Sequence, residues 1–337
     1  MKENETPNIL KPHSTYTFDY PQAIKFAEDQ TDIFWTDREI ALEKDLHDLK
    51  TELTEAELHG VTTVLKLFTE YELRIGSNYW LGRMMRVFKR PELQRMCALF
   101  GSVELNVHAP FYAKINELLG LDTDEFYSSY VDDPVLQERM QFIEDIVSRP
   151  IKNPFDVLIS LGAFSMVEGA VLYSNFAFLK HFQAEGKARL MNLVAGINFS
   201  VRDEHLHSTA GAWLFQQLAN EAKLSEEDEK ALHQIMIEVA EKIYSHEEKI
   251  VDMIFERGAI RGITDLQLKH FVQSRLNLCL QQLGYDPIYT VSYNPIASWF
   301  YKNIQANQMH DFFAKTGNAY NRDWKESAFN WEISEGV

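Results

Sequence analysis

Two pairs of residues combine an acid with a histidine at a spacing that places both side chains on one face of a helix. Glu204 and His207 are three residues apart in an otherwise apolar stretch, and Glu104 and His108 are four apart. The members of the second pair are about 40° apart around a helix axis. A carboxylate and an imidazole presented together suit a transition metal such as iron, manganese or zinc. The pairs are therefore candidate metal ligands, provided that other helices supply partners.

Two further carboxylates lie on other predicted helices. Glu168 interrupts the apolar run of residues 161–173, where a lone ionised carboxylate would carry a desolvation cost of about several kcal/mol. Its alternative role is a buried ion pair with an arginine. Glu72 lies in a more mixed run, and its alternative is a solvent-facing position beside Glu70 and Arg74. Four carboxylates and two imidazoles on four helices match the dinuclear carboxylate bundle, so we expect two divalent metal ions per chain.

Long helices are the elements that must position these residues. Only 15 Gly and 10 Pro occur in 337 residues, and alternating apolar runs typical of strands are scarce. Periodicity predicts a first helix over residues 22–33 and a short one from Arg38, then longer helices over 54–88, 91–119, 154–182, 188–221, 225–257 and 265–283, with shorter ones within 123–149. We therefore expect an all-α, ferritin-like helical bundle with the dinuclear site between four long helices. Residues 1–20 would form an arm, 21–305 the bundle and 306–337 a flexible tail.

Local signals fix several helix ends and predict one distortion. Thr54 and Glu57 form a capping box, Ser225 is a candidate N-cap, and Gly120 is a candidate C′ residue. Pro110 follows His108 inside its predicted helix, where it lacks an N–H and clashes with a carbonyl. A kink or π-bulge is therefore expected near the second acid–histidine pair, and such bulges concentrate at functional sites.

Composition excludes several classes of partner. Lys plus Arg is 33 and Asp plus Glu is 50, for a net charge of −17, which argues against binding nucleic acid or an anionic membrane surface. We find no signal-peptide core and no apolar run of membrane-spanning length. Cys97 and Cys279 sit in apolar contexts without metal-like or disulfide-like spacing. We therefore expect a soluble cytoplasmic protein with two reduced thiols.

Over nearly its whole length the sequence resembles the small, radical-generating subunit of class I ribonucleotide reductase. Residues 202–207 resemble the Arg-Asp-Glu-x-x-His motif of that family, and Glu168 keeps the family's spacing to Tyr173 and Phe176. Four further segments carry the resemblance: the lead-in at residues 196–200, Tyr112 four residues after His108, Phe34-Trp35, and Phe312-Phe313 with Tyr320 in the tail.

The resemblance implies a role for each of these residues. Tyr112 would bear the radical, in apolar surroundings that Phe111, Phe176, Phe178 and Phe199 could supply. Trp35 and Asp203 would relay the oxidising equivalent outwards from His108, and Tyr320 would pass it to a separate large subunit. The chain would act as a homodimer and dock the large subunit, which binds the ribonucleotides, through its C-terminal tail. Two irons are the first expectation, with manganese/iron or two manganese ions as alternatives.

The sequence departs from the family pattern at two positions. The usual Glu-x-x-His spacing would place a ligand at Leu105, so Glu104 takes that role through an altered helix or the ligand is missing. Many members have Asp where this chain has Glu72; some members with Glu there use a manganese/iron pair. Two other functions remain as alternatives: another dinuclear ferritin-like oxidase, acting on a lipid-like ligand or on iron, and a non-catalytic helical interaction protein.

Overall fold

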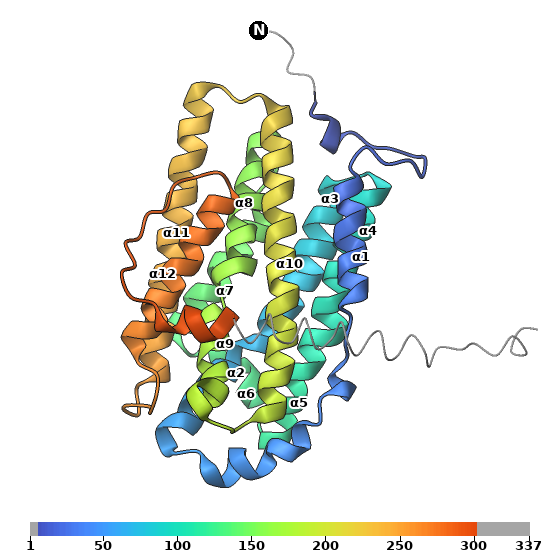
Figure 1. The fold of residues 1–337 in the computed structure, drawn as a ribbon. Helices are drawn as coiled ribbons and strands as arrows, with labels where there is room; N and C mark the ends of the chain where they lie inside the picture. The colour runs from blue at the N-terminus through green and yellow to red at the C-terminus, as the bar shows by residue number, and fades with distance from the viewer. Residues whose placement is uncertain (1–5, 302–337) are drawn as a thin grey trace, which may run out of the picture.

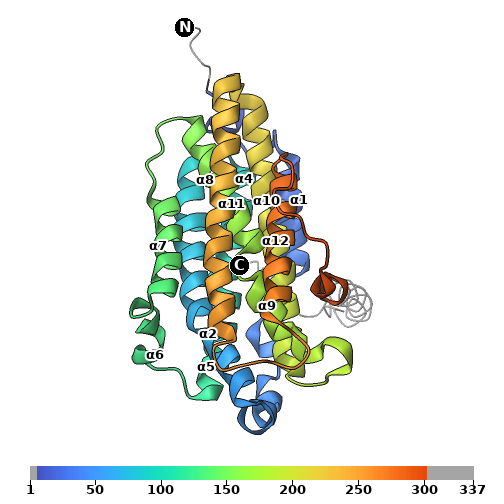
Figure 2. The ribbon, with the colours of Figure 1, turned by 90° about the vertical axis from the view of Figure 1, so that its left-hand side faces the viewer.

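The computed structural model describes residues 6–301, and all regular structure within that range is helical. The predicted all-α class is therefore confirmed. The long helices lie side by side in an elongated bundle (Figures 1 and 2): α2 (Glu55–Arg74), α4 (Pro91–Val103), α5 (Ala109–Leu119), α8 (Pro154–Ala170), α10 (Met191–Ala222), α11 (Glu226–Ile254) and α12 (Asp265–Gln282). Helix α10 packs most extensively against α8, and these two helices occupy the middle of the bundle.

Shorter elements flank this bundle. The other α-helices are α1 (Pro21–Asp32), α3 (Met85–Val87), α6 (Asp124–Ser128), α7 (Pro134–Ser148) and α9 (Tyr173–Lys180). The 3₁₀ segments are η1 (Asn8–Leu10), η2 (Asp37–Glu39), η3 (Leu42–Asp45), η7 (Ser129–Val131) and η8 (His181–Gly186). Three segments are π-helical: η4 (Asp48–Glu52), η5 (Ile75–Met84) and η6 (Glu104–His108). Helix α1 lies against α4 and α10, which brings the N-terminal part of the chain to the candidate site.

The predicted helix ends are confirmed where a capping signal was present. The Thr54 side chain accepts a hydrogen bond from the Glu57 backbone N–H, and Glu57 completes the capping box. The Ser225 side chain caps α11 by accepting a hydrogen bond from the Asp228 backbone N–H. Gly120 ends α5 in the left-handed conformation with φ 71°, which glycine adopts without steric cost. The predicted distortion before Pro110 is the π-helical segment η6.

Two predicted helices are less regular than their periodicity suggested. The helix expected over residues 54–88 changes to π-helical geometry at Ile75 and returns to α geometry at Met85. The helix expected over residues 154–182 is broken, because Val171 is extended and Leu172 is left-handed with φ 71°. Neither change carries a local signal such as proline, so hydrophobic periodicity alone could not reveal it.

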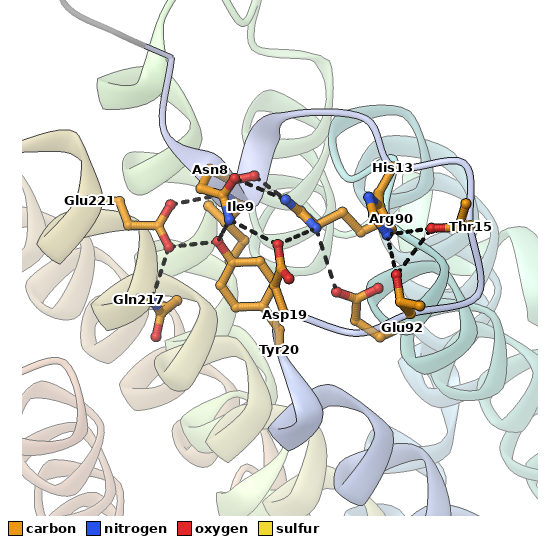
Figure 3. Close-up of polar contacts among 11 residues, drawn as sticks. Asn8, Ile9, His13, Thr15, Asp19, Tyr20, Arg90, Glu92, Gln217 and Glu221 are labelled. Atoms are coloured by element: carbon orange, nitrogen blue, oxygen red, sulfur yellow. Dashed lines mark hydrogen bonds and ion pairs between the residues drawn. The ribbon is translucent and has the colours of Figure 1, made fainter.

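The N-terminal arm is bound to the bundle from residue 6 onward. The Ile9 N–H and the Tyr20 hydroxyl donate to the two carboxylate oxygens of Glu221 on α10, at 2.8 and 2.7 Å (Figure 3). The buried Arg90 guanidinium donates to the carbonyl and side-chain oxygens of Asn8, both at 3.0 Å, and pairs with Asp19. These contacts join the arm to the ends of α10 and α4.

The expectation that no apolar run reaches membrane-spanning length needs a correction. The helical stretch Pro154–Ala184 is long and apolar enough to cross a membrane by length and composition. However, 89% of its apolar window is buried inside the molecule, as in the core helix of a globular bundle. This stretch carries Glu168, so the predicted ligand lies in the most thoroughly buried part of the fold.

Candidate metal centre

The structure brings together all six side chains that were predicted as metal ligands. Glu168 and Glu72 come from α8 and α2, whereas the two acid–histidine pairs come from η6 and α10. Each of the six is at most 2% exposed. Helices that are far apart in sequence therefore place four carboxylates and two imidazoles in one solvent-excluded volume.

The six residues form two overlapping groups of four. Within each group the potential ligand atoms lie within 4.8 Å of one another. One group is Glu72, Glu104, His108 and Glu204, and the other is Glu104, Glu168, Glu204 and His207. Glu104 and Glu204 belong to both groups and could each bridge two cations, whereas each group has its own histidine and its own further glutamate. This is the arrangement expected for a dinuclear metal site.

The π-helical segment η6 explains how Glu104 can act where the usual spacing would require a residue at 105. A π-helix forms i→i+5 hydrogen bonds, so each turn contains more residues than an α-turn. Residues four apart then point in nearly the same direction, and Glu104 Oε2 lies 2.8 Å from His108 Nδ1. Leu105 is partly exposed, and its side chain lies against Gly76 of η5. Of the two readings left open by the sequence, the geometry favours the altered helix.

Both histidines present the same nitrogen to the carboxylates. His108 Nδ1 lies 2.8 Å from Glu104 and 3.3 Å from Glu204, and His207 Nδ1 lies 2.7 Å from Glu104. Their Nε2 atoms point outwards, to Asp203 Oδ2 at 3.1 Å and to Gln30 Oε1 at 2.9 Å. An Nε2–H that donates to an outer acceptor leaves Nδ1 with a lone pair directed inward, as a metal-ligating imidazole requires.

A hydrogen-bonded network links the outer sides of the two histidines. Gln30 Nε2 donates to Asp203 Oδ1 at 3.1 Å, and Trp35 Nε1 donates to Asp203 Oδ2 at 2.7 Å. Asp203 therefore connects both imidazoles with Trp35, which is 2% exposed. The sequence pointed to Asp203 and Trp35 but not to Gln30, because a glutamine on a mostly polar helix gives no signal of an inward role.

Trp80 is a second residue that sequence reasoning missed. Its indole Nε1–H donates to Glu168 Oε1 at 2.7 Å and is fully buried. The Trp80 ring also lies edge-on to the His207 ring, with 6.0 Å between centroids. Trp80 stands in the π-helical segment η5, whose geometry the periodicity did not reveal, so its direction could not be predicted.

The electrostatics of the cluster fit bound cations. Burial raises the pKa of Glu72 well above its usual range, and the charge of Glu104 raises it further. Burial, and then the charge of the nearby Glu204, also raise the pKa of Glu168 well above its usual range. Burial would also raise the pKa of Glu104, but His108 and His207 outweigh that effect and lower it. Four carboxylates beside only two imidazoles cannot all stay ionised, whereas two divalent cations would balance their charge.

Unpaired carboxylate oxygens support the same conclusion. Both oxygens of Glu72 and Oε2 of Glu168 are buried and accept no hydrogen bond from any residue among 6–301. A buried polar atom without a partner is costly, and an ion that is bound in the native protein is one explanation. Oxygen-rich ligands with two imidazoles suit iron or manganese. The donor set therefore fits a pair of transition-metal ions.

Tyr112 lies one helical turn beyond His108 and is fully buried. Burial raises the pKa of its phenol well above the usual value, and the nearby Glu72 adds to the shift. Phe68 packs edge-on against its ring at 4.4 Å between centroids, and Phe111 lies at 5.1 Å. Phe176 stands behind Phe68 at 5.7 Å. The surroundings of Tyr112 are therefore aromatic and dry.

Of the four phenylalanines expected around Tyr112, only Phe111 has a ring contact with it, and Phe176 packs against Phe68 and Tyr173 instead. Phe199 packs against Trp35 at 5.4 Å, and Phe178 packs against His181 and Phe182. Phe68, which was not predicted, provides the shortest ring contact instead. The predicted relay residue Tyr320, together with Phe312 and Phe313, lies outside the described residues.

Comparison with known proteins identifies the family. Residues 13–295 match the family model described as ribonucleotide reductase, small chain. The chain belongs to this family. The match includes all six candidate ligands, Tyr112, Trp35 and Asp203. It favours a reductase small subunit over another dinuclear oxidase and over a non-catalytic helical scaffold.

Individual relatives agree with this assignment. A probable ribonucleoside-diphosphate reductase small subunit of Invertebrate iridescent virus 3 is 26% identical, over 90% of this chain and 82% of its own length. The ribonucleoside-diphosphate reductase subunit beta of Bacillus subtilis is also 26% identical, over 86% of this chain and 85% of its own. The enzyme class is therefore that of a ribonucleotide reductase, with this chain as its small subunit.

Solved structures show the same fold. The dimanganese(II) NrdF protein of Streptococcus sanguinis superimposes with a TM-score of 0.72 at 23% identity, covering 85% of this chain and 97% of that chain. The Rnr4 homodimer of Saccharomyces cerevisiae gives 0.70 at 18% identity, covering 90% and 93%. The arrangement of helices in this reductase small subunit is thus shared by proteins of very different sequence.

Proposed function

We propose that this reductase small subunit generates an oxidising equivalent with oxygen activated at a dinuclear metal centre, stores it as a radical on Tyr112, and passes it to a large subunit. The observation that carries the proposal is the pair of overlapping ligand groups, which lies next to both Tyr112 and the Asp203–Trp35 network. A metal-binding bundle without redox function would need neither neighbour.

The six ligand side chains would hold the two ions. Glu104 and Glu204, which belong to both groups, would contribute to holding both ions, and the Glu72–His108 and Glu168–His207 pairs would complete the separate groups. Bound redox-active ions would supply the oxygen-activating chemistry that side chains lack. Two irons are our first expectation. A manganese/iron or dimanganese pair is the alternative, and dimanganese is what the Streptococcus sanguinis protein holds.

Tyr112 would store the oxidising equivalent because its surroundings exclude water. Its raised pKa keeps the phenol neutral near pH 7, so oxidation to a neutral radical removes both an electron and a proton. The radical would then be in contact with the aromatic rings of Phe68 and Phe111 rather than with solvent or thiols. Burial is therefore a condition for storage as well as for stability.

Asp203 and Trp35 would carry the oxidising equivalent outwards. The Asp203 carboxylate accepts hydrogen bonds from His108 and from the Trp35 indole through the same oxygen, at 3.1 and 2.7 Å. A proton shared along this chain would allow Trp35 to lose an electron without building up charge in the core. Tyr320 in the C-terminal tail would complete the transfer. We propose that the tail docks a large subunit, which binds the ribonucleotides, and that this chain forms a homodimer.

Electron paramagnetic resonance after reconstitution with iron, manganese or both tests this proposal. We expect a tyrosyl signal that disappears in Tyr112→Phe and persists in Tyr79→Phe, a buried tyrosine on η5 outside the ligand groups. A tyrosyl signal that survives in Tyr112→Phe would place the radical elsewhere. A coupled mixed-metal signal without any tyrosyl component would place the oxidising equivalent on the metals.

A further inference from the structure

The chain breaks its helical path immediately after the candidate ligand Glu168. Helix α8 ends at Ala170, and α9 begins at Tyr173. Leu172, between them, adopts φ 71° and ψ −15°, a conformation that side chains with a Cβ disfavour. Neither residue of the junction is a glycine or proline that would produce the break by itself. The surroundings must therefore hold this conformation.

Three side chains from three other helices lie against the backbone at the break. The Tyr71 hydroxyl on α2 donates to the Val167 carbonyl at 3.2 Å. The Arg275 Nε on α12 donates to the Gly169 carbonyl at 2.9 Å. On the other side of the break, the backbone of Leu172 lies beside Glu247 on α11 and acts to lower the pKa of its carboxyl group, which burial raises. The Gly169 carbonyl at the break thus has a partner in Arg275, and the Val167 carbonyl accepts from Tyr71 in addition to the Val171 N–H.

Glu247 contacts both the strained residue and the helix that follows it. Its carboxylate accepts a hydrogen bond from the Ser174 hydroxyl on α9 and pairs with Arg139 on α7. Glu247, Arg139 and Ser174 are all fully buried. The Ser174 hydroxyl gives the Glu247 carboxylate a second partner beside Arg139, whereas Arg139 Nε and Nη1 are buried without a hydrogen-bond partner among the described residues.

We propose that Glu247 is a positioning residue: held by Arg139 and Ser174, it maintains the break after Glu168 and thereby directs the Glu168 carboxylate into the metal centre. This inference rests on the proposed function. It leads to a selective effect, because Glu168 belongs to only one of the two ligand groups. Disturbing the break should lower the affinity for the ion held by Glu168 and His207. The affinity for the ion held by Glu72 and His108 should stay the same.

Titration of the purified full-length protein with Mn²⁺ tests the proposal. Glu247→Gln keeps the side-chain shape but loses the charge, and Ser174→Ala removes one hydrogen bond while keeping the ion pair. The matched control is Glu57→Gln, since Glu57 is also a buried partner of an arginine, Arg189, but lies at the start of α2. Calorimetry gives the two affinities, paramagnetic resonance shows whether the two ions are coupled, and thermal unfolding reports stability.

We expect Glu247→Gln and Ser174→Ala each to lower the Mn²⁺ affinity of one site by on the order of 10-fold or more. Loss of a contact that supports a ligand has an effect of this size at other metal sites. At limiting Mn²⁺ the spectrum should change from that of a coupled pair to that of an isolated ion. Glu57→Gln should lower the melting temperature without changing the ratio of the two affinities. If Glu247→Gln does not fold, Ser174→Ala decides alone.

Two results would overturn the positioning role. Unchanged affinities at both sites would show that the break does not depend on this contact. Equal weakening of both sites in proportion to lost stability would reduce Glu247 to a structural residue. A wild-type protein that binds no Mn²⁺ and no iron would instead refute the proposed metal centre, so the two failures are distinguishable.

Discussion

Glu104 and Glu204 differ from the other candidate ligands because each belongs to both ligand groups. Glu104 also contacts both imidazoles, at 2.8 Å for His108 and 2.7 Å for His207. Glu72 faces only one group. The geometry therefore ranks the ligands: a shared carboxylate supports two cations, and a terminal one supports a single cation.

This ranking predicts how metal content responds to substitution. Glu104→Gln should lower the affinity for both ions by at least about 10-fold. Glu72→Gln should lower the affinity for one ion only, so that the protein loses that ion and retains the other. Elemental analysis after equilibrium dialysis against limiting iron or manganese measures the difference. Glu70→Gln is the control, because Glu70 lies two residues from Glu72 on α2, is partly exposed and pairs with Arg74. Equal losses in the Glu104 and Glu72 variants would refute the bridging role.

At the scale of single residues, the sequence revealed charged groups in apolar contexts and little else. Glu168 was recognisable because a carboxylate in an apolar helix needs a partner. Gln30 and Trp80 also form hydrogen bonds with ligands of the cluster, to His207 and Glu168. However, a glutamine on a polar helix and a tryptophan in an apolar helix are common in sequences and give no signal of such a role. Their roles depend on which way the side chain points, which only the folded chain determines.

Two π-helical segments determine the geometry of the site at the scale of elements. Segment η5 crosses η6 at close range, and a Cβ on Gly76 would lie only 2.9 Å from the Glu104 Cβ. Glycine at this position therefore allows the two segments to approach. Pro110 gave a reason to expect a distortion in η6, because it removes a backbone donor. Segment η5 and the break at Leu172 arise from tertiary contacts, so no local pattern predicted them.

Exchanging two adjacent residues tests the register of η6. The double substitution Glu104→Leu/Leu105→Glu restores the Glu-x-x-His spacing that an α-helix would need. If the π-helical geometry is fixed by its surroundings, the new carboxylate points towards partly exposed space and the protein should lose stoichiometric metal. Metal analysis and far-ultraviolet circular dichroism separate loss of ligation from loss of fold. A variant that retains both ions would show that this segment reverts to a regular α-helix.

At the scale of the whole molecule, the long helices bury the charged ligand side chains between them. They also bind the N-terminal arm through Glu221 at the end of α10 and Arg90 at the start of α4. The all-α class and most long helices could be predicted from periodicity and caps, because the core needs continuous apolar faces. The fixed arm at Ile9 and Tyr20 could not, since Glu221, its partner, is more than 200 positions away. The proposed docking segment, residues 306–337, lies outside the described residues.

Removing the tail tests whether radical formation in this chain is separable from its proposed interaction with a large subunit. A chain that ends at Ala306 should bind metal and form the tyrosyl signal like the full-length protein, since both sites lie within residues 6–301. Its turnover with a large subunit should fall to background, because Tyr320 and the proposed docking segment are gone. A chain lacking only residues 1–5 is the control and should keep its turnover. Full activity after tail removal would indicate docking elsewhere or a self-contained oxidase.

The most direct test of the central claim is anomalous diffraction from crystals grown with iron and manganese, measured at both absorption edges. We predict two peaks, one within each ligand group, with carboxylate oxygens of Glu104 and Glu204 in contact with both. The ratio of the peaks at the two edges would also give the identity of each metal. Crystals without a peak between the four helices, or with Glu104 and Glu168 turned towards solvent, would contradict the account.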